Sequence, residues 1–400
     1  MVSGYQQLSA QRARLMRMWL TLAGFIRRTL PAVRIGLGLI LGLGGLGVLG
    51  VLSSCGNGDS ERVIYVYNWA DYIGAHTLAD FEQATGIAVS LDTYDSDETM
   101  EAKMLAGDSG YDVVNTAMEF FGREIRAGAF ESLHREWLEG YENIDPEVLK
   151  IMAKADPGNR YVVPYMHSVN GFAYNRAMIK ARLPNAPVDS LALIFDPKIV
   201  AHFADCGVVL LDSPQDTIGL ALAYLHKNPN TRSAEDYQAA EQVIAKVMPF
   251  IRNFDSSEYV STLANGEVCI AMGWSSDYAV AMHKAKLAGL NVDLEFTVPK
   301  EGASATYNGW VIPKGALHPK DGHRFISFTL RPKVIAAITN EIYYGNDNRA
   351  ADRWVKPEIL HDPRLYPDAK MRARLFPMEE ADAATERLRT QIWTRLKAKH

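Results

Sequence analysis

The stretch VIYVYNWADYIGAHTLADFEQATGIAVSLDT, residues 63–93, indicates the fold class of the chain. Its β-branched and aromatic run Val63–Tyr67 is typical of a strand. The spacing of apolar residues predicts a helix over Thr77–Ala84, with Gly86 as its stop signal. Apolar and polar residues then alternate over Ile87–Thr93, which predicts a second strand. A strand, a helix and a strand in this order favour a parallel βαβ unit.

The rest of the chain continues the pattern. Ser96 can cap a helix that extends through Ala106, and a third short strand is expected over Asp112–Thr116. Two later runs, Val208–Leu211 and Glu267–Met272, also predict strands, and the charged stretch Ala381–Lys399 predicts a final helix. The sequence therefore predicts an α/β protein.

Length and charge narrow the possible functions. The 400 residues suffice for two ordinary globular lobes, and three cysteines are too few for a disulfide scaffold. The formal net charge of −5 hides an asymmetry, because residues 1–54 contain six arginines and no lysine or acidic residue. The remaining body has 36 basic and 47 acidic residues, a net charge of −11. An acidic body argues against a nucleic-acid partner, since that would require phosphate neutralisation.

The N-terminal segment has the pattern of an export signal. Its arginines precede the uncharged run Ile35–Leu52, a basic region followed by an apolar one. The sequence Leu52-Ser53-Ser54-Cys55-Gly56 resembles a bacterial lipobox, which implies lipidation of Cys55 and removal of the signal, residues 1–54. An uncleaved membrane anchor is the alternative. Both interpretations put the body outside the cytoplasm, behind a polar linker over residues 55–61.

Export makes a disulfide between Cys206 and Cys269 permissible. Such a bond would stabilise the fold by about 4 kcal/mol in the chain-entropy treatment. Two buried free thiols are the alternative. No cluster of histidines accompanies these cysteines, so no metal site is expected.

Carboxylates follow four of the expected strands. In open α/β sheets, ligands bind beyond the carboxyl ends of the strands. The segments there are Asn68–Tyr72, Ala117–Phe120, Asp212–Asp216 and Gly273–Asp277, and we expect the first two to be loops. Three of them place an aromatic residue close to a carboxylate.

This combination suits a cationic ligand with an aliphatic stem, because ring faces attract ammonium groups and carboxylates bond them. A polyamine fits that description. The alternative is that Trp69 and Trp274 belong to the core and that the aspartates cap loops. The chain has no signature of a nucleotide-binding loop, a serine hydrolase or a zinc protease, so we expect neither catalysis nor a cofactor.

At these residues the chain resembles the polyamine-binding solute receptors of bacterial ABC transporters, above all those that bind putrescine. The resemblance extends from about Val63 to Lys397, and its most specific segments are Tyr67–Tyr72, Ala264–Glu267 and Ala271–Trp274. It implies a two-lobed fold of the type II periplasmic-binding-protein class with the ligand cleft between the lobes. The implied first lobe is 62–165 plus 300–345, and the second is 166–299 plus 346–400. The Cys206–Cys269 disulfide is also implied.

The resemblance also implies the ligand-binding residues. Trp69 and Trp274 correspond to the rings that hold the alkyl stem, and Tyr72 and Tyr344 to further aromatic walls. Asp71 and Asp277 correspond to carboxylates that face amino groups. Asp216 stands where the putrescine receptors have a glutamate, so its side chain is one methylene shorter.

Several positions depart from the family pattern. Asn308 replaces an anchoring aspartate, Thr306 replaces an aromatic wall, and Ala70 and Ala117 replace serines. Glu119 adds a carboxylate that the family lacks. Our hypothesis is that Glu119 offsets the charge lost at Asn308 and so moves one cation subsite.

The resulting expectation is a monomeric, lipid-anchored receptor at the cell surface or in the periplasm. It would capture a di- or polyamine and deliver it to an ABC transporter permease. One alternative ligand is another cationic amine, such as agmatine or an amino-acid-like amine. The other alternative is an exported sensor on the same fold.

Overall fold

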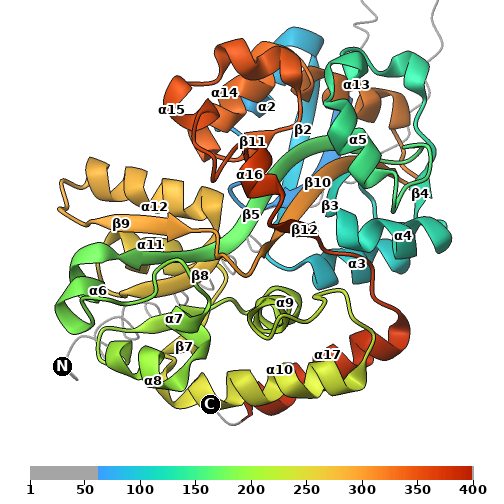
Figure 1. Ribbon diagram of the computed structural model, residues 1–400. Helices are drawn as coiled ribbons and strands as arrows, with labels where there is room; N and C mark the ends of the chain where they lie inside the picture. The colour runs from blue at the N-terminus through green and yellow to red at the C-terminus, as the bar shows by residue number, and fades with distance from the viewer. Residues whose placement is uncertain (1–61, 399–400) are drawn as a thin grey trace, which may run out of the picture. The chain divides into compact units, whose positions relative to one another are not determined.

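The computed structural model describes residues 62–398, in which helices and strands pack around separate hydrophobic cores (Figure 1). We call the elements around β1 to β3 the first lobe and those around β6 and β8 the second lobe. The predicted signal 1–54, the lipidation site Cys55 and the linker 55–61 lie outside the described residues. No helix within residues 62–398 is long and apolar enough to span a membrane.

Within residues 62–398, twelve strands join into one sheet. They are β1 (Arg62–Trp69), β2 (Ile87–Tyr94), β3 (Val113–Ala117), β4 (Phe130–Glu131), β5 (Val163–Asn175), β6 (Val208–Leu210), β7 (Asn253–Phe254), β8 (Ile270–Trp274), β9 (Leu294–Thr297), β10 (Ala303–Pro313), β11 (Gly345–Asn346) and β12 (Leu375–Pro377).

Helices cover these strands and connect them. They are α2 (Thr77–Thr85), α3 (Asp97–Leu105), α4 (Met118–Arg126), α5 (Pro146–Met152), α6 (Arg176–Arg182), α7 (Ala192–Phe195), α8 (Pro197–Val200), α9 (Pro214–Tyr224), α10 (Ala234–Val247), α11 (Tyr259–Ala264), α12 (Ser275–Leu287), α13 (Pro319–Thr329), α14 (Pro332–Ile342), α15 (Pro357–Leu360), α16 (Ala369–Arg372) and α17 (Ala383–Lys397).

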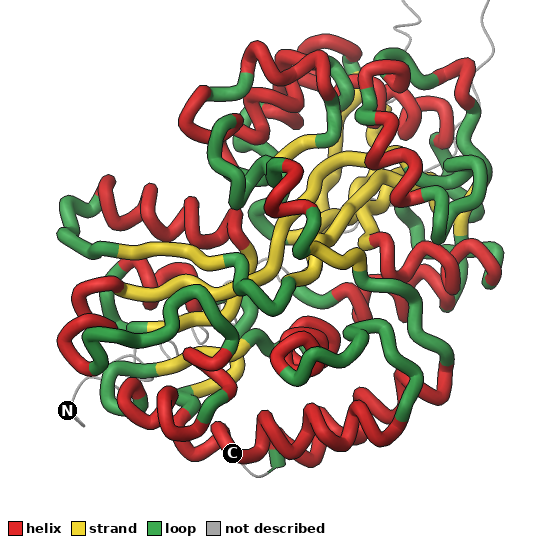
Figure 2. Tube along the Cα trace, in the orientation of Figure 1, coloured by secondary structure: helices red, strands yellow, loops and turns green. Residues whose placement is uncertain are grey.

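The main strand order is β2-β1-β3-β10-β5-β8-β6-β7 (Figure 2). β1 pairs in parallel with β2 and β3, which confirms the predicted βαβ arrangement at the start of the body. β10 is antiparallel to both β3 and β5, so the sheet is mixed. Its pairing could not be predicted locally, because β10 comes from almost 200 residues later in the chain than β3.

The long strand β5 links the lobes. Its first residues, Val163–Met166, contribute to the core around β1, whereas Val169–Tyr174 contribute to the core around β8. β5 pairs with β10 over its first half and with β8 over its second. Side chains near the middle of β5 therefore lie where the two lobes meet.

Most local predictions are confirmed. α2 ends before Gly86, whose φ of 70° is left-handed and costs glycine little. The Ser96 hydroxyl accepts a hydrogen bond from the Thr99 amide and caps α3. The loop predicted over Ala117–Phe120 is wrong, because β3 passes directly into α4 at Met118. An acidic residue in the first turn and a buried apolar face favour the helix there.

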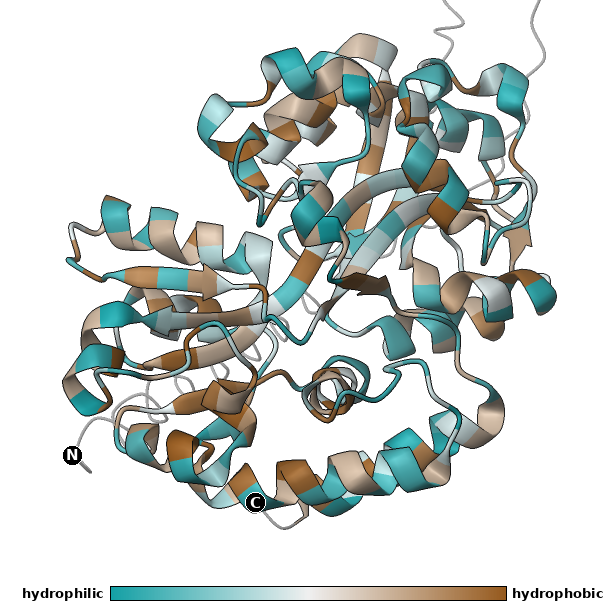
Figure 3. Ribbon diagram, viewed as in Figure 1, coloured by the Kyte–Doolittle hydropathy of each residue, from teal (hydrophilic) through white to brown (hydrophobic). Residues whose placement is uncertain are grey.

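The C-terminal part of the chain contributes to both lobes. Apolar side chains of residues 351–365 belong to the first-lobe core; they are Ala351, Val355, Ile359 and Leu365. α17 packs into the second-lobe core through Ile392, Trp393 and Leu396. Figure 3 shows hydrophobic and hydrophilic residues alternating along α10 and α17, as expected for helices with one buried face.

Cys206 and Cys269 form a disulfide, with their Cα atoms 5.5 Å apart. Both residues are buried in the second-lobe core. The bond ties the start of β6 to the start of β8, the two strands that precede α9 and α12.

We predict that reducing this bond, or replacing both cysteines by serine, lowers the free energy of unfolding by about 2–4 kcal/mol. The physical reason is the larger conformational entropy of the unfolded chain once the loop is open. Urea unfolding with and without reductant measures the change. An identical unfolding midpoint in both conditions would contradict this role.

Candidate functional site

Three carboxylates occupy the first turns of helices that follow strands. Glu119 is the second residue of α4, after β3, while Asp216 and Asp277 are the third residues of α9 and α12. The segment after β8 is helical from Ser275. Helix N-termini favour negative charge, so all three positions suit a carboxylate.

Hydroxyl groups from both lobes bond Asp277. The Tyr259 hydroxyl, from α11 of the same lobe, donates to Asp277 Oδ2. The Tyr344 hydroxyl, which follows α14 in the first lobe, donates to Oδ1 over 3.1 Å. Burial raises the pKa of Asp277, the two tyrosines oppose that shift, and the exposed Asp71 carboxylate adds to it. We call Asp277 and its electrostatic neighbour Asp71 the first anionic group.

Tyr259 was missed by the sequence analysis. Its hydroxyl also accepts a hydrogen bond from the Trp274 amide, at 3.3 Å. Gly273 makes room for it, because a Cβ there would lie 2.5 Å from the Tyr259 oxygen. The glycine before Trp274 was a signal that a bulky side chain approaches the end of the strand. That this side chain is Tyr259 depends on tertiary structure and could not be predicted.

Asp216 is held by three polar side chains. Its carboxylate accepts hydrogen bonds from Ser213 (2.9 Å), Asn170 (2.8 Å) and Ser304 (3.4 Å). Burial raises the pKa of Asp216, and these three bonds oppose the shift. Asn170 lies in the middle of β5 and Ser304 in β10, so both inter-lobe strands fix this side chain.

Glu119 couples electrostatically to Asp216. Burial, with Asp216 and Glu98 adding to it, raises the pKa of Glu119 to about 8. The backbone amide of Glu119 and the guanidinium of Arg389 act in the opposite direction. Glu119 and Asp216 thus form a second anionic group, with one carboxylate from each lobe.

Aromatic and amide side chains lie beside these groups. Tyr72 packs edge-on against Tyr344, with ring centroids 4.6 Å apart, and donates a long hydrogen bond of 3.5 Å to Asn308 Oδ1. The Asn308 amide in turn donates to Asn115. The Trp69 ring packs against the Tyr94 ring, with the ring centroids 4.7 Å apart. Tyr72, Tyr344 and Asn308 therefore meet, as the sequence analysis expected of one site.

Trp69 and Trp274 are both partly buried, and they lie in different lobes. Trp69 packs at the edge of the first-lobe cores, and Trp274 at the edge of the second-lobe core. Each indole therefore contributes to packing while keeping some surface accessible.

Two further carboxyl groups, Asp97 and Glu124, escaped the sequence analysis. Burial and the neighbouring Glu119 raise the pKa of Asp97 well above its usual value, and Asp97 Oδ1 has no hydrogen-bond partner. Glu124 is fully buried, has a pKa raised to about 8 by burial, and accepts one bond from Thr116. Asp97 lies in the helix predicted after Ser96, whereas no helix was predicted at Glu124, and the inward orientation of both side chains depends on tertiary structure.

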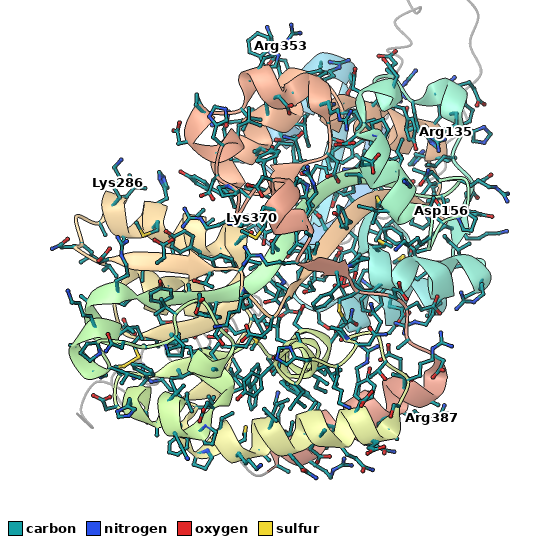
Figure 4. The ribbon with its side chains drawn as sticks, viewed as in Figure 1. Arg135, Asp156, Lys286, Arg353, Lys370 and Arg387 are labelled. Atoms are coloured by element: carbon teal, nitrogen blue, oxygen red, sulfur yellow. A yellow bond between two sulfur atoms is a disulfide. The ribbon has the colours of Figure 1, made fainter. Side chains whose placement is uncertain are left out.

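The described residues concentrate negative charge here. Figure 4 shows the labelled cations Lys286, Arg353 and Arg387 extending outward from the ribbon. No three histidine, cysteine or acidic side chains of residues 62–398 form a group that could hold a metal ion. Two anionic groups accompanied by aromatic and amide side chains can instead bind an elongated organic cation.

Comparison with known proteins gives a consistent result. Residues 68–336 match the profile of bacterial extracellular solute-binding proteins. The putrescine-binding periplasmic protein PotF of Escherichia coli is 40% identical over 340 residues, which cover 84% of this chain and 92% of that protein. A putrescine/agmatine-binding protein of Pseudomonas aeruginosa is 38% identical over 339 residues, covering 84% and 92%.

Solved structures show the same fold. The TpPotD lipoprotein of Treponema pallidum has a TM-score of 0.72 and 26% identity, with 84% of this chain and 99% of that chain covered. Its similarity extends over nearly all of the described residues.

Proposed function

This chain belongs to the bacterial extracellular solute-binding protein family, and we propose that it captures a putrescine-like di- or polyamine and delivers it to an ABC importer. The family consists of transport receptors and is not an enzyme family. The observation that carries the proposal is Asp277, a half-buried carboxylate bonded by hydroxyls from both lobes. The names of the relatives, which include putrescine binders, support the ligand class.

In this proposal each anionic group receives one end of the ligand. One ammonium group lies at Asp277 and Asp71, and a second lies at Asp216 and Glu119. The indoles of Trp69 and Trp274 pack on the methylene stem, and each ring that faces a cation adds about 0.5–2 kcal/mol. Tyr72, Tyr344 and Asn308 complete the walls.

The coupling of Glu119 to Asp216 supports a specific form of the compensation hypothesis. Asn308 bonds Tyr72 and Asn115, whereas the electrostatic neighbours of Glu119 are Asp216, Arg389 and Glu98. We propose that charge lost at Asn308 is regained beside Asp216, so that the cation subsite lies closer to Glu119.

The proposal includes a location and a division of the chain. We propose export directed by residues 1–54 and anchoring through lipidated Cys55, a monomeric receptor, and delivery to a permease. The Treponema pallidum relative is a lipoprotein, which supports the anchor. The expected lobe boundaries at residues 165 and 299 are kept as proposals. The third expected boundary, at residue 345, is moved to about residue 366, because residues 351–365 pack in the first-lobe core.

The test is a thermal-shift panel of putrescine, cadaverine, spermidine, agmatine and amino acids on wild-type protein and on Asp277→Asn. Saturating ligand at about 100 times its Kd stabilises a protein by about 2.7 kcal/mol, so the shift is measurable. We expect amines to stabilise the wild type. Asp277→Asn should bind about ten- to hundredfold more weakly, because it loses a charge-assisted hydrogen bond.

Asp293→Asn, a substitution of an exposed aspartate paired with Arg176, serves as the matched control and should keep wild-type affinity. A panel in which no amine stabilises the wild type would refute the proposed function. Equal amine affinity of Asp277→Asn and wild type would refute the role of this carboxylate.

Glu119→Gln tests the compensation hypothesis by calorimetric titration against pH. Because the pKa of Glu119 is about 8, wild-type affinity for a cation should increase as the pH rises through that value and the carboxylate ionises. The glutamine variant should lack this increase. At pH 8.5 it should bind about five- to tenfold more weakly. Glu82→Gln on α2 is the control, and identical pH profiles for Glu119→Gln and wild type would sink the hypothesis.

A further inference from the structure

A contact between the lobes is made by residues other than the proposed ligand residues. Residues 378–382 lead from β12 to α17 and pass beside α4 of the first lobe (Figure 1). We call residues 378–386, which include the first turn of α17, the C-terminal strap. Arg123 and Arg126 extend from α4 toward it, and Glu380 and Glu386 of the strap receive them.

Glu386 bonds arginines from both lobes through one oxygen. Its Oε1 accepts a hydrogen bond from Arg123 Nη1 of the first lobe at 2.9 Å and from Arg389 Nη2 of the second lobe at 2.6 Å. Arg123 is itself fixed by a two-pronged pair with Glu101 of α3, at 2.7 and 3.0 Å. The Glu386 carboxylate is about one-third exposed and the Arg123 side chain less than one-quarter, so solvent screens this contact only in part.

The same network reaches the proposed ligand site. The Arg389 side chain is only 5% exposed, and its Nη1 donates to Gln215 Oε1 at 2.9 Å. Gln215 directly precedes Asp216 on α9. The Arg389 guanidinium also lowers the pKa of Glu119, which stands on α4 one turn before Arg123. Glu386 is thus connected through Arg389 to Gln215, the residue next to Asp216, by two hydrogen bonds.

Apolar packing does not replace these ion pairs here. A cavity of about 270 Å³ separates α3 and α4 from α9 and α17, and both Glu386 and Arg389 line it. The backbone of Gly122 on α4 lies close to the strap. A Cβ atom at this position would clash with Glu380 Oε2. The second pair, Arg126 with Glu380, adds a contact of 3.0 Å beside it.

We propose that Glu386 is an inter-lobe bridging residue that stabilises the closed arrangement and so sets ligand affinity without touching the ligand. This inference rests on the proposed function for its ligand, but the bridge itself is a property of the lobes. In this proposal the contact forms only when the lobes close, so removing it lowers the closed fraction, and the apparent Kd rises by the same factor. The effect should appear as faster dissociation, since the contact forms after the ligand enters.

The experiment compares wild type, Glu386→Gln, Arg123→Gln and the double variant. Kd and dissociation rate are measured with putrescine or the most stabilising amine of the panel. The closed fraction is measured separately, as the distance distribution between spin labels on α13 and α10. Arg395→Met, which breaks the ion pair of α17 with Glu241 inside the second lobe, is the matched control.

We expect each single variant to raise Kd about three- to tenfold, the double variant to match the singles, and the control to stay at the wild-type value. The closed fraction should fall by a similar amount in the single and double variants and should stay at the wild-type value in the control. Unchanged Kd and distances in both single variants, or additive losses in the double variant, would overturn the bridge. If the wild type binds no amine, the proposed function fails. The bridging role of Glu386 is then tested by the spin-label distances of the ligand-free proteins alone. Variants that are as closed as the wild type would overturn that role.

Discussion

The arrangement depends on one constraint: the carboxylates of Glu119, Asp216 and Asp277 are partly buried where the lobes meet, and few cations accompany them. Removing a carboxylate from water raises its pKa, and neighbouring carboxylates add to the cost. The structure offsets part of this cost with helix N-termini and with tyrosine, serine and asparagine donors around Asp277 and Asp216. The remainder is available to an incoming cation. Arg389 and Lys284 act on Glu119 and Asp277 but leave both pKa values raised, so the site favours a ligand that brings further positive charge.

The sheet explains why these groups converge. β5 and β10 run through both lobes, and β5 presents Asn170 to Asp216 at their junction. The strands that lead into α4, α9 and α12 all end near this junction, so each helix begins with its carboxylate directed toward the same region. The disulfide fixes the starts of β6 and β8, and therefore the relative positions of the helices that carry Asp216 and Asp277.

Local features of the fold could be predicted from the sequence, because they are encoded within a few residues. Examples are β1, α2 with its stop at Gly86, and the cap at Ser96. The candidate residues Asp216 and Asp277 were also found from their places after strands. Tyr259 and Arg389 were not found. Tyr259 bonds Asp277, which lies 18 residues later on a neighbouring helix, and Arg389 bonds Gln215, which lies 174 residues earlier in the sequence. No periodicity or short motif carries such contacts.

The central claim is that binding of a cationic ligand ionises carboxyl groups of the site. The protons released on binding measure this ionisation directly. Amine binding is titrated calorimetrically at pH 7.5 in phosphate and in Tris, whose ionisation enthalpies differ. Because Glu119 has a pKa of about 8 in the free protein, a bound ammonium group should ionise it and release protons to the buffer. The account predicts enthalpies that differ between the buffers in the direction of proton release, and a smaller difference in Glu119→Gln. Equal enthalpies in the two buffers, or proton uptake on binding, would contradict it.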